Sequence, residues 1–268
     1  MLTTTRHFTT HDGIRLAYLD QGGDGQPVIA LHGAYGRARS MLRLTEHLGP
    51  GYRLIALDQR GHGHSARADD YSREAYVADL AALITHLGLG PDRPPVLVGH
   101  SLGGINAYQF AARHPESVAA LVVADFPAEY RADLGDDWLA ALPARFPSLR
   151  ALFVALDEVV TYGEPWHFHE SVVEFPDGWG FLWRAEDVFA TKRQVCGSWW
   201  RDWEAGGQPA LVVRGGDSDV VTRDQAFAMA ARRPGTEVVE IPGGGHDFYL
   251  THPAQFGTAV RGFLDRLH

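Results

Sequence analysis

Short apolar runs alternate with segments of helical spacing along both ends of the chain. The continuous apolar run at 27–31 and the short run at 96–98 are typical of strands that are buried on both faces of a parallel sheet. The segment 52–57 is apolar apart from Arg53 and is expected to be another such strand. The segments 38–48 and 72–87 lie between them and repeat their apolar positions at helical spacing. This alternation predicts an α/β fold with a mostly parallel, doubly wound sheet.

The same alternation continues outside these segments. Gly88 should stop the helix over 72–87, and Ser72 is a plausible N-cap for it. The remaining expected elements are two short strands within 8–20, strands at 117–124, 209–213 and 237–241, and helices at 105–113, 223–232 and 253–267.

Residues 128–207 interrupt the pattern and read as mixed helices and loops. All seven tryptophans fall in this segment, together with 14 acidic and seven basic side chains, a net charge of −7. Sheets of this kind place their sites at the carboxyl ends of the strands. We therefore expect a helical cap at 128–207 over that edge, and a core made of 1–127 and 208–268. If the acidic side chains face the mouth of the site, they should disfavour anionic substrates.

Composition excludes several classes of protein. The 268 residues are 45% apolar and 21% charged, as in ordinary globular domains, and contain no apolar run of 18 residues. The formal charge of −9 argues against a nucleic-acid binder. The N-terminus has no apolar core of a signal peptide, and the single cysteine, Cys196, excludes an internal disulfide. We expect a cytoplasmic protein with no membrane partner; its oligomeric state cannot be read from the sequence.

A possible nucleophile lies between the apolar run at 96–98 and the following helix. Ser101 has glycine two positions before it and two after it, the Gly-x-Ser-x-Gly pattern, in a strand-to-helix context. A sharp turn there needs flanking residues without side chains, since the strand and the helix nearly touch. Such a turn exposes the Ser101 hydroxyl and directs the helix N-terminus at whatever the serine attacks.

A serine hydroxyl needs a base, and the base needs an acid. His246 lies on a glycine-rich loop after the last strand, at the same edge as Ser101. Asp219 follows the preceding strand, so the order Ser101, Asp219, His246 is the one expected for this architecture. Attack on a carbonyl also needs donors for the oxyanion. By position, these would be the backbone N–H groups of Leu102 and Ala34.

In combination, these motifs resemble the α/β-hydrolase fold superfamily. Some of its members take the acid from the strand that follows the nucleophile helix, which makes Asp125 the alternative to Asp219. The segments that carry the resemblance are His32-Gly33-x-x-Gly36, Asp58-x-Arg60-Gly61-x-Gly63-x-Ser65, Gly99-His100-Ser101-Leu102-Gly103-Gly104, the Asp219 loop and Gly245-His246.

The resemblance also narrows the reaction. Haloalkane dehalogenases and epoxide hydrolases of this fold attack with aspartate, and the perhydrolase-like branch usually has a bulky residue where Ala34 stands. The resemblance thus implies a serine hydrolase of small or medium, mostly apolar carboxylic esters or lactones, with an acyl-enzyme and without cofactor or metal. A carbon–carbon bond hydrolase, or a cofactor-free oxygenase or lyase, is the alternative, and a non-catalytic binding protein is a third. Candidate substrate-contacting residues are Tyr35, His100, Trp138, Trp183 and Trp199.

Overall fold

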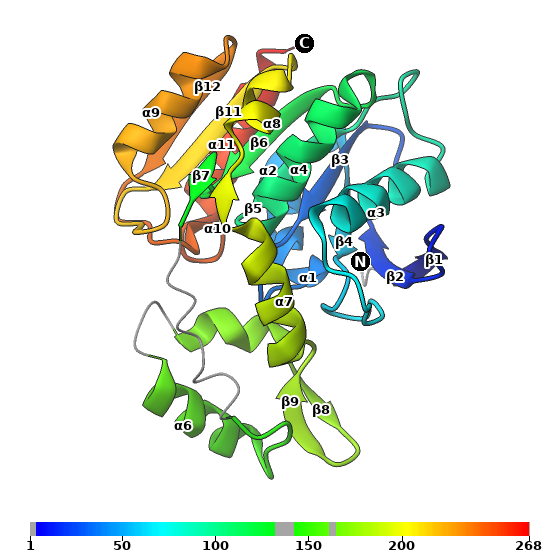
Figure 1. Ribbon diagram of the computed structural model, residues 1–268, viewed down its shortest axis with the longest axis vertical. Coiled ribbons are helices and arrows are strands. Elements are labelled where there is room, and N and C mark those ends of the chain that lie inside the picture. The colour runs from blue at the N-terminus through cyan, green and yellow to red at the C-terminus, as the bar shows by residue number, and fades with distance from the viewer. Residues whose placement is uncertain (1–3, 132–141, 161–164, 268) are drawn as a thin grey trace.

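The computed structural model describes residues 4–131, 142–160 and 165–267, with only the backbone of 165–167. An eight-stranded sheet with the order β1-β2-β4-β3-β5-β6-β11-β12 forms its centre (Figure 1). β1 and β2 are antiparallel to their neighbours, and the other strand pairs are parallel. The expected α/β fold is therefore confirmed. The strands are β1 (Thr5–Thr9), β2 (Arg15–Asp20), β3 (Gln26–Leu31), β4 (Tyr52–Asp58), β5 (Val96–His100), β6 (Ala120–Ala124), β11 (Ala210–Gly215) and β12 (Thr236–Ile241).

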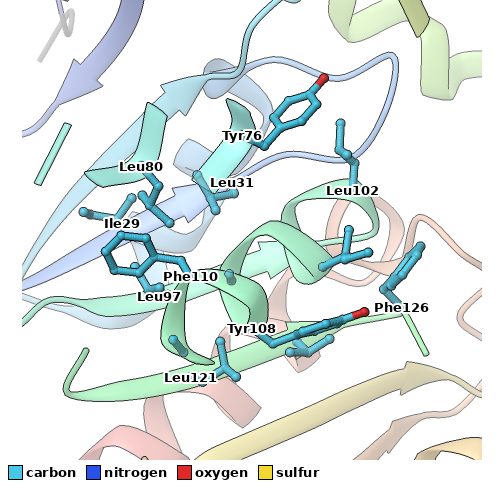
Figure 2. Packing of buried hydrophobic residues seen from close by; sticks show 14 of the residues in the cluster. Ile29, Leu31, Tyr76, Leu80, Leu97, Leu102, Tyr108, Phe110, Leu121 and Phe126 are labelled. Atoms are coloured by element: carbon cyan, nitrogen blue, oxygen red, sulfur yellow. The ribbon is translucent and has the colours of Figure 1, made fainter. Parts of the chain in front are cut away.

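Helices cover both faces of this sheet because its strands alternate between two apolar clusters. On β3, Ile29 and Leu31 belong to one cluster, and Val28 and Ala30 belong to the other. The first cluster packs under α3 and α4 (Figure 2), and the second packs under α1, α2 and α11. The helices of the core are α1 (Ala38–Met41), α2 (Thr45–Leu48), α3 (Arg73–His86), α4 (Leu102–Arg113), α9 (Arg223–Arg232), α10 (Phe248–Thr251) and α11 (Pro253–Asp265), with 3₁₀ turns η1 (Leu42–Leu44) and η2 (Pro115–Ser117).

The local signals in the sequence explain where several of these helices begin. Ser72 caps α3, because its hydroxyl accepts the backbone N–H of Ala75. The single helix expected over 38–48 is instead α1, η1 and α2 in succession. Among the described residues, no helix is both long enough and apolar enough to cross a bilayer.

The segment after β6 forms a separate lobe, which lies below the sheet in Figure 1. It has an apolar cluster of its own, built around Leu152, Leu156, Phe168 and Trp183. The expectation of helices and loops alone is corrected here, because two antiparallel strand pairs also occur. One of them, β7 with β10, joins the two ends of the insertion. The elements are β7 (Glu129–Tyr130), α6 (Leu149–Val159), the 3₁₀ turn η3 (Pro165–Ser171), β8 (Val172–Phe175), β9 (Gly178–Phe181), α7 (Ala185–Val195) and β10 (Gly197–Ser198).

One helix of the expected cap range packs with the core. α8 (Trp200–Ala205) contains Trp203, which is fully buried in the cluster under α3 and α4. The indole N–H of Trp203 donates to the carbonyl of Met229 on α9, 2.8 Å away. The lobe that we call the cap below therefore consists, in the part of the chain that the structure describes, of 128–131, 142–160 and 165–198, and α8 belongs with the sheet.

Candidate active site

Ser101 occupies a strained turn between β5 and α4. Its backbone has φ 50° and ψ −116°, a region that side chains rarely adopt. The flanking glycines are required, because a Cβ on Gly99 would lie 2.1 Å from the Gly103 carbonyl oxygen. A Cβ on Gly103 would lie 2.3 Å from the Leu31 carbonyl oxygen. The turn thus has the geometry that the sequence pattern predicts, and the Ser101 side chain is half-buried.

A chain of hydrogen bonds joins Ser101 to a buried carboxylate. The Ser101 hydroxyl lies 3.1 Å from Nε2 of His246, and Nδ1 of His246 lies 2.7 Å from Oδ2 of Asp125. An ionised carboxylate can only accept, so Nδ1 carries the hydrogen and Nε2 is left to accept from the serine. This arrangement can take a proton from Ser101 as its oxygen attacks.

Asp125, not Asp219, contacts the histidine. Asp125 follows β6 directly, has φ 53°, and is fully buried. Its carboxylate accepts the Gly215 N–H at 3.0 Å and the Ser218 hydroxyl, in addition to His246. The preferred sequence candidate is corrected for a topological reason: β6 lies between β5 and β11 in the sheet, so its end is beside both Ser101 and the His246 loop. Asp217 and Asp219 are exposed on the loop after β11.

Two opposing effects set the pKa of His246. Burial lowers it, but the hydrogen bond and charge of Asp125, with the charges of Asp247 and Asp219, outweigh burial and raise the pKa above its ordinary value of 6.5. Asp219 therefore acts on the histidine at a distance, although it does not bind it. A raised pKa makes the imidazole a stronger base, as general base catalysis requires.

His100 supports His246 from behind. Its side chain is fully buried, and its Nε2 donates to the His246 carbonyl at 2.9 Å. Its ring packs against the rings of His246 and Tyr249, with centroids 4.7 and 4.3 Å away. The expectation of a substrate contact is corrected, because a fully buried ring that holds the base offers no surface to a substrate.

The loop after β3 lies against the start of α4. The Gly103 N–H donates to the His32 carbonyl at 3.1 Å, and the Gln59 side chain donates to the same oxygen at 2.6 Å. Leu102 is the first residue of α4, so the helix itself makes no use of its N–H. Ala34 follows two residues after His32 and is half-buried. The two expected oxyanion donors thus belong to segments that are hydrogen-bonded to each other.

The other residues expected to contact substrate have different positions. Tyr35 has φ 67° and packs against Trp183, with ring centroids 5.2 Å apart. Trp199 donates its indole N–H to the Val195 carbonyl at 2.9 Å and packs against the core cluster. Trp138 lies outside the described residues. Tyr35 and Trp183 therefore join the cap to the loop that carries Ala34.

A cavity of about 640 Å³ lies between the cap and the turn that contains Gly61 and Gly63. Trp183 and Arg67 contribute to its wall. None of the described residues that line it is Ser101, Asp125 or His246. The cavity is thus lined by the cap and the Gly61–Gly63 turn and not by the hydrogen-bonded residues of the site.

Two side chains near the site were not anticipated. Ser218 follows β11 and donates to Asp125, and Lys192 on α7 donates to the Tyr35 hydroxyl at 3.4 Å. The sequence contained a signal for the second, since Lys192 is the single lysine of the chain and shares a helix face with Val188 and Val195. Nothing in the local sequence distinguishes Ser218 from an ordinary turn serine.

One group of side chains could in principle hold a metal. Among the described residues, ligand atoms of His100, His246 and Asp247 lie within 4.8 Å of one another. Both nitrogens of His246 are already paired, with Ser101 and Asp125. A metal at His246 would therefore compete with the hydrogen-bond chain.

The parallel sheet and the hydrogen-bond chain from Ser101 to Asp125 are typical of hydrolases with a serine nucleophile. Comparison with known proteins identifies the family. The chain belongs to the α/β-hydrolase fold family, which it matches over residues 26–253.

Individual relatives match nearly the whole chain. It is 32% identical to an esterase of Mycobacterium tuberculosis over 267 residues, 93% of this chain and 86% of the esterase. It is 28% identical to 2-(acetamidomethylene)succinate hydrolase of Mesorhizobium japonicum over 255 residues, 91% of this chain and 89% of that protein. The crystal structure of E-2-(acetamidomethylene)succinate hydrolase superimposes with a TM-score of 0.85 at 25% identity and covers 98% of this chain and 99% of that one. The family and these relatives support a hydrolase.

Proposed function

We propose that the protein is a serine hydrolase that cleaves carboxylic esters or lactones through an acyl-enzyme. The observation that carries this proposal is the hydrogen-bond chain from Ser101 through His246 to the buried Asp125. The similarity to an esterase of Mycobacterium tuberculosis along most of both chains supports ester hydrolysis.

In the first half of the reaction, the Ser101 oxygen attacks the carbonyl carbon while Nε2 of His246 takes the hydroxyl proton. The Asp125 carboxylate stabilises the resulting imidazolium and keeps its orientation. The N–H groups of Leu102 and Ala34 receive the negative charge on the carbonyl oxygen. His246 then gives its proton to the departing alkoxide, which leaves an acyl group on Ser101.

In the second half, water replaces the alcohol. His246 takes a proton from water as the water oxygen attacks the acyl carbon, and returns it to the Ser101 oxygen as the acid leaves. The strained turn favours both halves, since it presents the Ser101 oxygen to the substrate while its backbone stays fixed by Gly99 and Gly103.

The proposal is tested with nitrophenyl esters of increasing acyl length and with a fluorophosphonate probe. The parent should hydrolyse the esters and bind one probe molecule, at Ser101. Ser101→Ala should take up no probe and lose about 10⁴- to 10⁶-fold in kcat. Absence of labelling, or hydrolysis that survives Ser101→Ala, would contradict the proposal.

A further inference from the structure

The cap places a positively charged side chain beside the loop that carries Ala34. Lys192 lies on α7, and its Nζ is 3.4 Å from the Tyr35 hydroxyl and 5.7 Å from the centre of the Tyr35 ring. Tyr35 follows Ala34 directly, so the ammonium contacts the residue next to an oxyanion donor of the proposed reaction. In Figure 1, α7 runs from the cap toward the core.

The position of Lys192 on its helix is unusual. Val188, Thr191 and Val195 are buried on α7 at helical spacing, and Lys192 lies on the same face. Thr191 is held there by a hydrogen bond of its hydroxyl to that of Tyr76, 2.7 Å away. The next residue, Arg193, is exposed. Lys192 is half-buried on this side of α7, which faces the core.

On one side of the ammonium lies an aromatic cluster. Tyr35, on which it rests, packs against Phe168 and Trp183, with ring centroids 5.1 and 5.2 Å away. Burial lowers the pKa of Lys192 to about 8, although the nearby Cys196 thiol opposes this effect. The group is thus still mostly protonated at pH 7. A positive charge in surroundings of this kind interacts more strongly with an anion than it would in water.

We propose that Lys192, together with the Tyr35 hydroxyl, binds a carboxylate carried by the substrate, so that the enzyme prefers esters with a negative group near the scissile bond. This inference rests on the proposed function, since it concerns the substrate of the same site. An ammonium can donate three hydrogen bonds, so a substrate carboxylate would join or replace the acceptors that it has without substrate. The net charge of −7 over 128–207 predicts the opposite preference, but it is a sum over the segment, whereas Lys192 contacts the residue that follows Ala34.

The test compares two esters that differ only in charge. Nitrophenyl glutarate monoester carries a terminal carboxylate, and nitrophenyl valerate has the same number of acyl carbons without it. The measured quantity is the ratio of kcat/KM for the charged ester to that for the neutral ester, determined within each enzyme. This ratio does not depend on the fraction of enzyme that is correctly folded.

Lys192→Met should lower this ratio about 10- to 100-fold, the effect of losing one hydrogen bond to a charged group. Lys192→Arg should restore part of it, because arginine keeps the charge. Arg193→Met is the matched control, since it removes the same charge from the same helix at an exposed position, and it should leave the ratio within about twofold.

The outcomes separate the two proposals. Hydrolysis of the valerate ester with an unchanged ratio in Lys192→Met would overturn the carboxylate site and leave the serine hydrolase intact. An equal fall in Lys192→Met and Arg193→Met would also overturn it, because the effect would then be the long-range field of the cap. If the parent hydrolyses neither ester and Ser101 takes up no fluorophosphonate, the proposed function fails and the carboxylate site fails with it.

Discussion

The carboxyl edge of the sheet and the cap hold their residues by different means. At the sheet edge, Ser101 and Asp125 both have positive φ, and they are fixed by hydrogen bonds and by glycines in near contact. In the cap, Leu156, Phe168 and Trp183 are held by the packing of apolar side chains. The first region depends on backbone geometry, and the second depends on shape and volume.

This difference predicts how each region responds to change. A backbone conformation with positive φ, or a near contact between two main chains, accepts few residues. Apolar clusters accept many combinations of similar volume. Substitutions at the sheet edge should therefore abolish the reaction, whereas substitutions in the cap should alter which substrates bind.

After the loss of the nucleophile itself, the largest effect is expected at the acid. Asp125→Asn should lower kcat about 10⁴-fold, since the amide would disturb the tautomer of His246 that accepts from Ser101. Asp219→Asn should change kcat less than about threefold, because Asp219 is exposed and its effect on the base is a screened charge. Steady-state kinetics on a nitrophenyl ester measures both. A loss in Asp219→Asn as large as in Asp125→Asn would contradict the assignment.

The next effect concerns the glycines of the turn. A Cβ on Gly99 would lie 2.1 Å from the Gly103 carbonyl oxygen, so Gly99→Ala should lower the free energy of unfolding by about 1–3 kcal/mol. Gly207→Ala is the control, since a Cβ there would meet nothing within 4 Å. It should change the free energy of unfolding by less than about 0.5 kcal/mol. Urea unfolding measures both, and equal stabilities would show that the turn relaxes around the methyl group.

The sheet edge was also the part that sequence could predict. Apolar runs and glycines predict the order of strands and helices, the turn at Ser101 and the position of His246. Buried strands require apolar residues, and the tight turns require glycine. The acid was harder to place. Asp125 and Asp219 both follow strands that end at the same edge, and only the lateral order of β5, β6 and β11 shows which of them reaches His246.

The cap was predictable as a segment but not as a structure. Its tryptophans and acidic side chains mark a change of composition, yet the antiparallel pair β8–β9 is too short to show alternation. Trp203 looks like a cap residue in sequence and belongs to the core in space, because helix α8 returns to the sheet before β11. Tertiary structure determines packing partners of this kind, and local sequence patterns do not predict them.

A smaller effect is expected where the cap meets the catalytic loop. Trp183 packs against Tyr35, and in Trp183→Phe the smaller ring should loosen that contact. We expect KM to rise about two- to tenfold with kcat nearly unchanged, the cost of one aromatic pair. Val154→Ala, at a position on α6 that is 49% exposed, should leave both constants as they are. A collapse of kcat in Trp183→Phe would instead place Trp183 among the residues that hold the turn.

The smallest effect concerns the pKa of His246, which the contact with Asp125 and the more distant charge of Asp219 both raise. The imidazole acts as a base only when neutral, so kcat/KM should rise with pH, and the midpoint of this rise should lie above 6.5, because the pKa of His246 is raised despite its burial. Asp219→Asn removes one of the charges that raise this pKa, so the midpoint should move to lower pH while the plateau stays unchanged.

The control for this shift is Asp224, which is also exposed and is not among the charges that act on His246. Asp224→Asn should therefore not move the midpoint. The shift caused by Asp219→Asn should shrink as salt is added, since salt screens an exposed charge. The midpoint of the parent should stay above 6.5 in salt, because the contact of His246 with the buried Asp125 is not screened. An equal shift of the midpoint in Asp219→Asn and Asp224→Asn would contradict this prediction, because the net charge of the protein, and not the proximity of Asp219, would then account for the shift.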